Sequence, residues 1–235
     1  RIRELIKNKL TAPSAQVLPV LQQTLQQGSI PQQVLSLEVL AERRTEQAQE
    51  LIQQQLGTVP PPVGQAAVKG LLKFSPAPMS LVVVFAVEYD LSADKLLEWW
   101  PEISDPAIEA LVELTQHQEQ AVTTLAVEIL GRLAPERVIN KVKAGLVDEE
   151  LSDKESLLEV LIKIGSPAES ALPEIVNIIW QGEDVWLRYK ALRALRAVVP
   201  DLEEVMSLLQ RLQEDSEELI RLEAEGIIEE AATNC

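Results

Sequence analysis

The segment "DVWLRYKALRALRAVVP" (residues 184–200) decides the fold of this 235-residue chain. Its apolar residues Leu187, Ala191, Leu195 and Val198 recur three or four positions apart, which is the spacing of one buried face of an α-helix. Basic and aromatic residues occupy positions between them. The pattern therefore predicts a helix with one buried face and one basic, aromatic face.

The same apolar spacing recurs along the C-terminal half of the chain. Equivalent triplets lie 31, 34 and 33 residues apart: Ala126/Leu130/Leu133, Leu157/Leu161/Ile164, Ala191/Leu195/Val198 and Ala224/Ile228/Ala231. A further apolar-periodic segment precedes each triplet, starting near residues 106, 135, 171 and 200, and each has a proline at or near its start, where a helix tolerates it. Two helices this short cannot bury their apolar faces alone, so the pairs are expected to stack in sequence order as a solenoid.

The period is weaker upstream of residue 104. Second helices are predicted at 34–44 and 64–74, first helices at 14–28 and 45–57, and a stiff turn at "GTVPPPVG" (57–64). In the irregular stretch 75–103, "MSLVVVFAV" favours a strand by propensity, but a lone strand would leave its backbone groups unpaired, so we predict a buried helix. We expect one domain over 1–235, with four clear repeats (104–232), two weaker ones (11–74) and the irregular unit.

Two segments carry a resemblance to a known family. "SLLEVLIKIGSPAESALPEI" (156–175) and "DVWLRYKALRALRAVVPDL" (184–202) resemble HEAT repeats, which have a proline near the start of the first helix, an acid at the turn, an arginine, then Ala and Leu four apart. The resemblance covers 104–232. It implies an all-α, right-handed α-α superhelix of the HEAT/armadillo-like type with about six to seven helical pairs, whose second helices line the concave side.

Acids and bases four residues apart recur at equivalent repeat positions. The pairs are Glu150 with Lys154, Asp184 with Arg188, and Glu217 with Arg221. This order suits both side-chain contact and the helix dipole. The resemblance to HEAT repeats implies that these residues form a ladder that ties neighbouring units together.

The net charge of −16 opposes non-specific attraction to phosphate backbones and anionic lipids and favours basic partners. No apolar run reaches the roughly 18 residues needed to cross a bilayer. The single cysteine, Cys235, suits a reducing compartment. We therefore expect a cytoplasmic protein that binds neither nucleic acid nor membrane, although a chain that begins at Arg1 also fits a piece of a larger regulatory protein.

No catalytic or metal-binding constellation is visible in the sequence. His117 is the only histidine, in a predicted exposed turn, and it has no nearby cysteine with which to bind zinc. The glycines form no phosphate-binding motif. We therefore expect no cofactor, no metal, no small-molecule ligand and no enzymatic activity.

Two predicted helices, 64–74 and 184–199, are basic within this acidic chain. The candidate partner contacts on them are Trp186, Lys190, Arg193, Arg196, Lys69 and Lys73. Arg and Trp are the residues most often found at binding hot spots, although a solvated helix face would have the same composition. The sequence favours a non-catalytic protein–protein scaffold that docks a partner protein or peptide segment along the groove of the second helices.

Two other functions are compatible with this type of repeat. "EWWPEISD" (98–105) and "DVWLRYKAL" (184–192) are similar to the active-site helices of HEAT-like alkylpurine DNA glycosylases, which would assign Trp99, Trp100, Asp105 and Trp186 to a site. The net charge of −16 argues against a phosphate-binding groove. Phycobilin lyases also resemble HEAT repeats, but no segment of this sequence indicates a bilin site.

Overall fold

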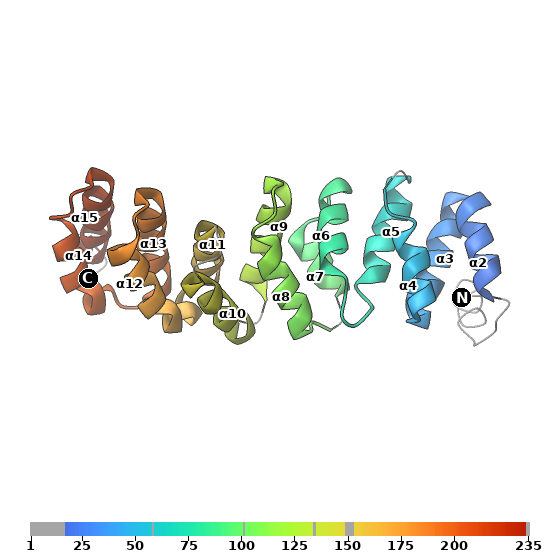
Figure 1. The fold of residues 1–235 in the computed structure, drawn as a ribbon, viewed down its shortest axis with the longest axis horizontal. Coiled ribbons are helices and arrows are strands. Elements are labelled where there is room, and N and C mark those ends of the chain that lie inside the picture. Colours follow the sequence, from blue (N-terminus) through green and yellow to red (C-terminus); the bar gives the residue numbers. More distant parts are fainter. Residues whose placement is uncertain (1–16, 58, 101, 134, 149–152, 234–235) are drawn as a thin grey trace. The chain divides into compact units, whose positions relative to one another are not determined.

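The computed structural model describes residues 17–57, 59–100, 102–133, 135–148 and 153–233. Within these ranges the chain forms fourteen α-helices and two 3-10 helices, without a strand (Figure 1). The all-α prediction is confirmed, and the described α-helices fall into seven consecutive pairs along the sequence. By its internal contacts the chain divides into two compact units, unit 1 (residues 1–111) and unit 2 (residues 112–235).

Unit 1 is built from helices that pack against their sequence neighbours. Helix α3 packs against α2, α4 and α5, and α5 also packs against α4 and α6. The bounds are α2 (Val17–Gln27), α3 (Ile30–Arg43), α4 (Glu46–Gln53), α5 (Pro61–Leu71), α6 (Met79–Glu88) and α7 (Ala93–Trp99), while α8 (Asp105–Leu114) crosses the boundary between the units. The four upstream helices were thus predicted in the right order.

The turn predicted at 57–64 is shorter in the structure. Helix α5 begins at Pro61, so Pro61 and Pro62 lie in its first turn and Gly64 is already helical. Proline is tolerated there because the first amides of a helix have no intrahelical partner. The prolines therefore start the helix rather than separate it from its predecessor.

The valine-rich stretch is helix α6, as predicted. Its residues Met79, Val82, Val83 and Ala86 are buried, so burial has overridden the strand propensity of valine. Helix α7 then ends at Trp99, and Trp100 beyond it is 5% exposed. The irregular unit is thus a helix pair with an aromatic end.

Tyr89, at the end of α6, holds three parts of unit 1 together. Its hydroxyl donates to the carbonyl of Gly57 (2.9 Å) and accepts from the Gly57 amide (3.0 Å). Its ring lies against Gly64 so closely that a Cβ there would stand 2.1 Å from it. Gly57 also has a φ of +105°, which disfavours other residues. The two glycines therefore let α6, α5 and the turn before α5 meet around one phenol.

Unit 2 stacks its second helices in sequence order. Helix α9 packs against α11, α11 against α13, and α13 against α15, while the first helices α10, α12 and α14 pack against the second helices that follow them. The bounds are α9 (Gln120–Arg132), α10 (Pro135–Val147), α11 (Lys154–Ile164), η1 (Ser166–Ala171), α12 (Leu172–Gln181), α13 (Val185–Val198), η2 (Leu202–Val205), α14 (Met206–Leu212) and α15 (Glu218–Thr233). The stacking predicted for this region is confirmed within the unit.

The repeat triplets form the core of unit 2. Of the twelve triplet residues, all but Ile164, Ile228 and Ala231 are buried. In α15, Ile227 is buried in place of Ile228, together with Ile220 and Ala224. The 3-10 helices η1 and η2 lead directly into α12 and α14, so these first helices have an irregular first turn that the sequence pattern did not predict.

Candidate functional site

The six predicted contact residues lie on two surfaces, one in each unit. In unit 2, Trp186, Lys190, Arg193 and Arg196 lie on α13 together with Tyr189, and these five residues are called the α13 surface below. In unit 1, Lys69 lies on α5 and Lys73 just beyond it. The two surfaces are described separately.

Helix α13 is anchored firmly enough to present exposed side chains in fixed positions. The carboxylate of Asp184 caps its start by accepting from the amides of Trp186 (2.7 Å) and Leu187 (3.1 Å). The apolar side of the helix is buried at Ala191, Leu192, Ala194, Leu195 and Val198, whereas Leu187 in the first turn is only half-buried. The α13 surface therefore projects from a helix that is held at its cap and along its core face.

Trp186 is the most exposed large hydrophobic residue among those described, with 64% of its surface accessible. Its ring meets the Tyr189 ring edge to face, with 6.2 Å between the centroids. Two aromatic rings in this arrangement support each other and give a rigid apolar surface at low entropic cost. Tyr189, which the sequence analysis did not single out, thus belongs to the same surface.

The cations of the α13 surface are mostly neutralised by neighbouring helices. Lys190 Nζ lies 3.7 Å from Glu155 Oε2 and 3.8 Å from Glu159 Oε2, both on α11. Arg196 pairs with Glu230 on α15 at 2.5 Å. Arg193 is exposed and has no ion pair with any described residue. The basic stripe is therefore partly structural, and within the α13 surface Arg193 is the cation for which no partner lies among the described residues.

These ion pairs follow the repeat period, which is a signal present in the sequence. The partners are 31 to 35 residues apart in Lys73–Glu42, Lys143–Glu174, Lys190–Glu159, Lys190–Glu155 and Arg196–Glu230. Residues one period apart occupy equivalent places on adjacent stacked helices. Opposite charges at that separation therefore indicate contact between units.

Two cavities adjoin the α13 surface. One of about 310 Å³ is lined by Glu155, Asp184, Trp186, Tyr189 and Lys190. The other, of about 260 Å³, is lined by Gln120, Thr123, Thr124, Val127, Ser156, Glu159, Lys163 and Lys190. Because both include Lys190, we call them together the Lys190 groove. It crosses the second helices α9, α11 and α13, where the sequence analysis expected a partner to bind.

Arg188 connects α13 to the next helix pair, but not through the acid that was predicted. Its Nε donates to the carbonyl of Ile179 (2.8 Å), and its guanidinium donates to both carboxylate oxygens of Asp215 in the turn before α15. Asp184 does not pair with Arg188 because its carboxylate caps α13. The expected pairing within the helix is therefore wrong at this position, and a link between repeats replaces it.

The predicted pair Glu217–Arg221 differs in the same way. Arg221 donates to the carbonyls of Asp215 (2.7 Å) and Ser216 (3.0 Å) rather than to Glu217, whose own amide donates to Asp215 Oδ1 (3.0 Å). Lys154 is the first residue of α11, and Glu150 lies outside the described residues. Asp215, which the sequence analysis missed, is thus the acid on which the contacts converge.

Asp215 is held in its ionised form. Burial is the largest influence and raises the pKa of this carboxyl, but hydrogen bonds from Arg188 and from the Glu217 amide, with the charges of Arg188 and Arg221, outweigh it. The pKa therefore lies below the usual 3.8. Side-chain exposures of 12% for Arg188 and 10% for Asp215 make this an almost buried ion pair.

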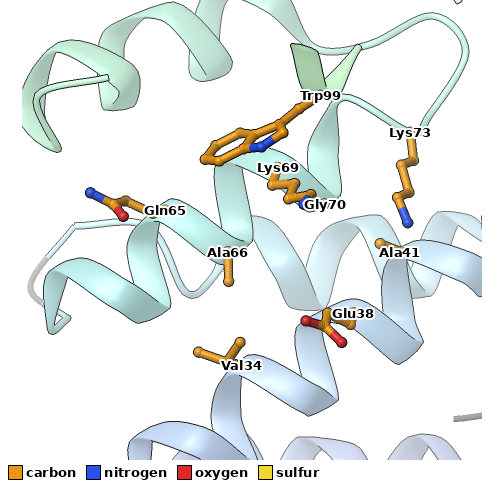
Figure 2. Close-up of a pocket in the computed structure, with 9 residues that line it drawn as sticks. All are labelled: Val34, Glu38, Ala41, Gln65, Ala66, Lys69, Gly70, Lys73 and Trp99. Atoms are coloured by element: carbon orange, nitrogen blue, oxygen red, sulfur yellow. The ribbon is translucent and has the colours of Figure 1, made fainter. Parts of the chain in front are cut away.

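The unit 1 surface contains a pocket of about 170 Å³, called the Trp99 pocket (Figure 2). Helix α3 contributes one wall and α5 the other, and the indole of Trp99, at the end of α7, lies beside Lys69 in Figure 2. The lining residues are Val34, Glu38, Ala41, Gln65, Ala66, Lys69, Gly70, Lys73 and Trp99. Both unit 1 contacts predicted from sequence, Lys69 and Lys73, therefore line one pocket.

Two lysines flank Trp99. The Nζ atoms of Lys69 and Lys95 lie 5.2 and 5.3 Å from the centre of its ring, within range of a cation–π interaction. Lys95 also pairs with Glu98 (3.1 Å), and Lys73 pairs with Glu42 (2.5 Å). Lys69 is exposed and has no acid partner within the described part of the chain.

The residues considered for catalysis differ in their exposure. His117 is exposed, and its Nδ1 accepts from the Glu119 amide (3.1 Å). Trp100 is buried, whereas Trp99 is only half-buried. The residues that the structure describes contain no cluster of three or more potential metal ligands. None of the described helices is both long enough and apolar enough to span a membrane.

No protein-family model and no curated protein matches the chain. Among solved structures, human deoxyhypusine hydroxylase in complex with glycerol is similar at 16% identity and a TM-score of 0.42, over 97% of this chain and 88% of that one. Two engineered proteins are similar at 18% and 15% identity with TM-scores of 0.42 and 0.39, over 92% of this chain and 98% and 96% of theirs. Function is therefore inferred from this chain's own residues.

Proposed function

We propose that this chain is a non-catalytic scaffold of HEAT-like repeats that binds a peptide segment of a partner protein in the Lys190 groove. The observation that carries the proposal is Trp186, which is 64% exposed on a helix fixed by its cap and its core, next to Tyr189 and a cavity. An exposed aromatic pair of this kind gains most from being covered by a partner.

The charge of unit 2 favours a basic segment. Residues 112–235 carry 12 Lys and Arg against 25 Asp and Glu, a net charge of −13, whereas residues 1–111 carry 9 against 12, a net charge of −3. Nearly all of the chain's negative charge thus belongs to the unit that contains the groove. A field of this sign attracts basic segments and speeds their association.

The part of the Lys190 groove beside Trp186, which is the cavity of about 310 Å³ and is called the Trp186 cavity below, can bind an arginine or lysine side chain. It combines the face of an exposed indole with the carboxylates of Glu155 and Asp184. An indole face and nearby carboxylates are the groups that bind cationic side chains best. The ammonium of Lys190 already lies between Glu155 and Glu159, so a peptide cation would share Glu155 with Lys190.

Arg193 supplies a second point of recognition. It lies seven residues beyond Trp186 on the same helix, which is a displacement of about 10 Å along the axis. An extended peptide covers that distance in about three residues. A segment with Arg or Lys in the Trp186 cavity and Asp or Glu three residues away therefore satisfies both ends of the α13 surface.

Support for the non-catalytic part of the proposal comes from the same residues. The single histidine is exposed and bonded only to a neighbouring amide, and the described acids and His117 form no metal-binding group. The one serine of the groove lining, Ser156, donates its hydroxyl to the Asp153 carboxylate that caps α11, which is a structural role. These observations support a groove that is used for recognition.

The proposal is tested by titrating the protein with the peptide acetyl-Gly-Arg-Gly-Gly-Asp-Gly-amide and following the indole NMR signals. The Trp186 signal, assigned with Trp186→Phe, should shift and saturate. Trp186→Ala should weaken binding about tenfold, as expected for a hot-spot residue. Trp180→Ala is the matched control, because Trp180 is also exposed (39%) but lies on α12 against Arg211. The site is refuted if both substitutions weaken peptide binding equally, or if neither of them weakens it.

Changes of peptide charge test the two ends of the α13 surface separately. Replacing the peptide Arg by Gln should weaken binding to the Trp186 cavity, and replacing Asp by Asn should weaken binding only when Arg193 is present. Arg193→Glu should therefore remove the preference for Asp over Asn while circular dichroism stays unchanged. A preference that survives Arg193→Glu would exclude Arg193 as the second contact.

A further inference from the structure

We infer that the Trp99 pocket of unit 1 is a second binding site, which takes an aromatic side chain of a partner peptide and holds the carboxylate of the next residue with Lys69. This site shares no residue with the Lys190 groove. The inference therefore does not depend on the proposed function of unit 2.

The size of the pocket matches one aromatic ring. Its volume is about 170 Å³, and an apolar cavity of about 150 Å³ is sufficient to bind benzene. The room exists because α3 and α5 present small residues to it, namely Ala41, Ala66 and Gly70, with Val34 beside them. A larger side chain at Ala66 would extend into this space, whereas a Cβ at Gly70 would meet Ala41 and Ile52.

Trp99 gives the pocket its preference for a ring over an aliphatic chain. Its indole forms one side of the pocket, as Figure 2 shows, and is half-buried at the end of α7. Aromatic pairs gain an interaction beyond area burial when their rings lie offset or edge to face. The two cations near its ring, on Lys69 and Lys95, also restrict where the indole can move. A phenyl or phenol ring therefore has both space and a partner.

Lys69 sets the charge of the adjacent group. Of the three lysines around the pocket, Lys73 is paired with Glu42 and Lys95 with Glu98, but Lys69 has no acid partner among the described residues. Its ammonium lies 5.2 Å from the indole centre at the pocket wall. A carboxylate from a partner would supply the ion pair that the described residues of this chain do not give Lys69.

Lys69 fixes the side of the pocket on which the acidic residue lies. It comes from α5, whereas Val34, Glu38 and Ala41 line the opposite wall from α3 (Figure 2). A carboxylate is attracted by the Lys69 ammonium, so the acidic neighbour of the ring lies on the α5 side. With a net charge of only −3 in unit 1, this local cation decides the selectivity more than the overall field does.

The test compares three tetrapeptides by NMR titration: acetyl-Gly-Phe-Glu-Gly-amide, its Gln counterpart, and the same peptide with Ala in place of Phe. The Phe-Glu peptide should shift the Trp99 indole signal, assigned with Trp99→Phe, in a saturable manner. It should bind about threefold more tightly than the Phe-Gln peptide, the ratio expected for one exposed ion pair. The Ala peptide should leave the signal unchanged.

Two lysine variants separate recognition of the acid from support of Trp99. Lys69→Met should abolish the difference between the Phe-Glu and Phe-Gln peptides but keep the ring binding. Lys95→Met is the matched control, because Lys95 lies equally near the indole but does not line the pocket. It should preserve the threefold difference. Ala66→Leu should fill the pocket and abolish binding of both Phe peptides.

The inference fails if none of the peptides shifts the Trp99 signal of the folded protein. It also fails if the two Phe peptides bind equally, if Lys69→Met and Lys95→Met have the same effect, or if a Phe-Lys peptide binds more tightly than Phe-Glu. None of these outcomes affects the test with Trp186→Ala, because that residue is in the other unit.

Discussion

Arg188→Met removes the connection that Arg188 makes between α13 and the turn before α15. In the native protein the guanidinium donates to both carboxylate oxygens of Asp215 and to the carbonyl of Ile179, and both charged side chains are almost buried. Met keeps the length and the apolar stem of the side chain but none of these donors. Asp215 is then left as a largely buried charge.

The expected loss of stability follows from the Asp215 carboxylate, which the substitution leaves buried without its arginine partner. Removing one partner of a buried ion pair costs about 3–5 kcal/mol. Asp215 still accepts from the amide of Glu217 and keeps Arg221 nearby, so we expect the lower end of this range, about 3 kcal/mol. Asp215→Asn should cost only about 1–2 kcal/mol, because its amide oxygen still accepts from Arg188.

The assay is urea unfolding followed by far-ultraviolet circular dichroism, with hydrogen exchange of α13 and α15 as the local readout. The double variant Arg188→Met/Asp215→Asn leaves no buried charge. Its loss should therefore be smaller than the sum of the two single losses by about 1 kcal/mol or more. A loss below about 1 kcal/mol for Arg188→Met, or strictly additive single losses, would refute the assigned role of the pair.

The ion pair between Arg188 and Asp215 also predicts how the free energy of unfolding changes with pH. Because the pKa of Asp215 is lowered by folding, its contribution is fully present above the unfolded value of about 3.9 and is lost as pH falls through the folded value. The difference in unfolding free energy between the wild type and Arg188→Met should thus be largest near neutral pH. It should shrink steadily once the pH is taken below about 4.

Three further predictions concern the glycines, Tyr89 and the cap of α13. Gly64→Ala places a Cβ 2.1 Å from the Tyr89 ring and should cost about 1–3 kcal/mol in urea unfolding, whereas Gly226→Ala, whose Cβ meets nothing within 4 Å, should stabilise α15 by up to about 1 kcal/mol. Burial raises the pKa of Tyr89, and the hydrogen bond with Gly57 opposes this only in part. The contribution of Tyr89 to folding stability is therefore complete below about pH 10 and is lost as pH rises through the folded pKa. Melting curves of Tyr89→Phe should lack that alkaline loss of stability. Asp184→Ala removes two cap hydrogen bonds and should lower stability by about 1 kcal/mol, visible as a lower melting temperature.

The repeat architecture was predictable because it depends on aliphatic residues that recur at helical spacing. The triplet containing Ala191, Leu195 and Val198 marks a buried helix face, and its recurrence requires neighbours that cover it. Even the valine-rich α6 was predictable, since a lone strand had no partner for its backbone. The 3-10 starts of α12 and α14 were not, because no residue type in them excludes a regular first turn.

The candidate site was only partly predictable. The sequence indicated a basic, aromatic face on α13, but the acids that neutralise Lys190 and Arg196 come from other repeats. They become visible only when opposite charges are sought one period apart. The contact of Tyr89 with Gly57 and Gly64 leaves no such signal, because it depends on how α6, α5 and the turn before α5 meet.

In unit 2 the helices that form the Trp186 cavity differ from the helix pair at the C-terminal end, and this affects peptide binding when that end pair opens transiently. The residues around the Trp186 cavity come from α11, α13 and the cap of α13, whereas α15 has its main contacts with α13 and α14. Transient detachment of the α14–α15 pair thus breaks the links of Arg188 and Arg196 without removing any wall of the cavity. Fraying at that pair relaxes the scaffold but leaves its recognition surface assembled.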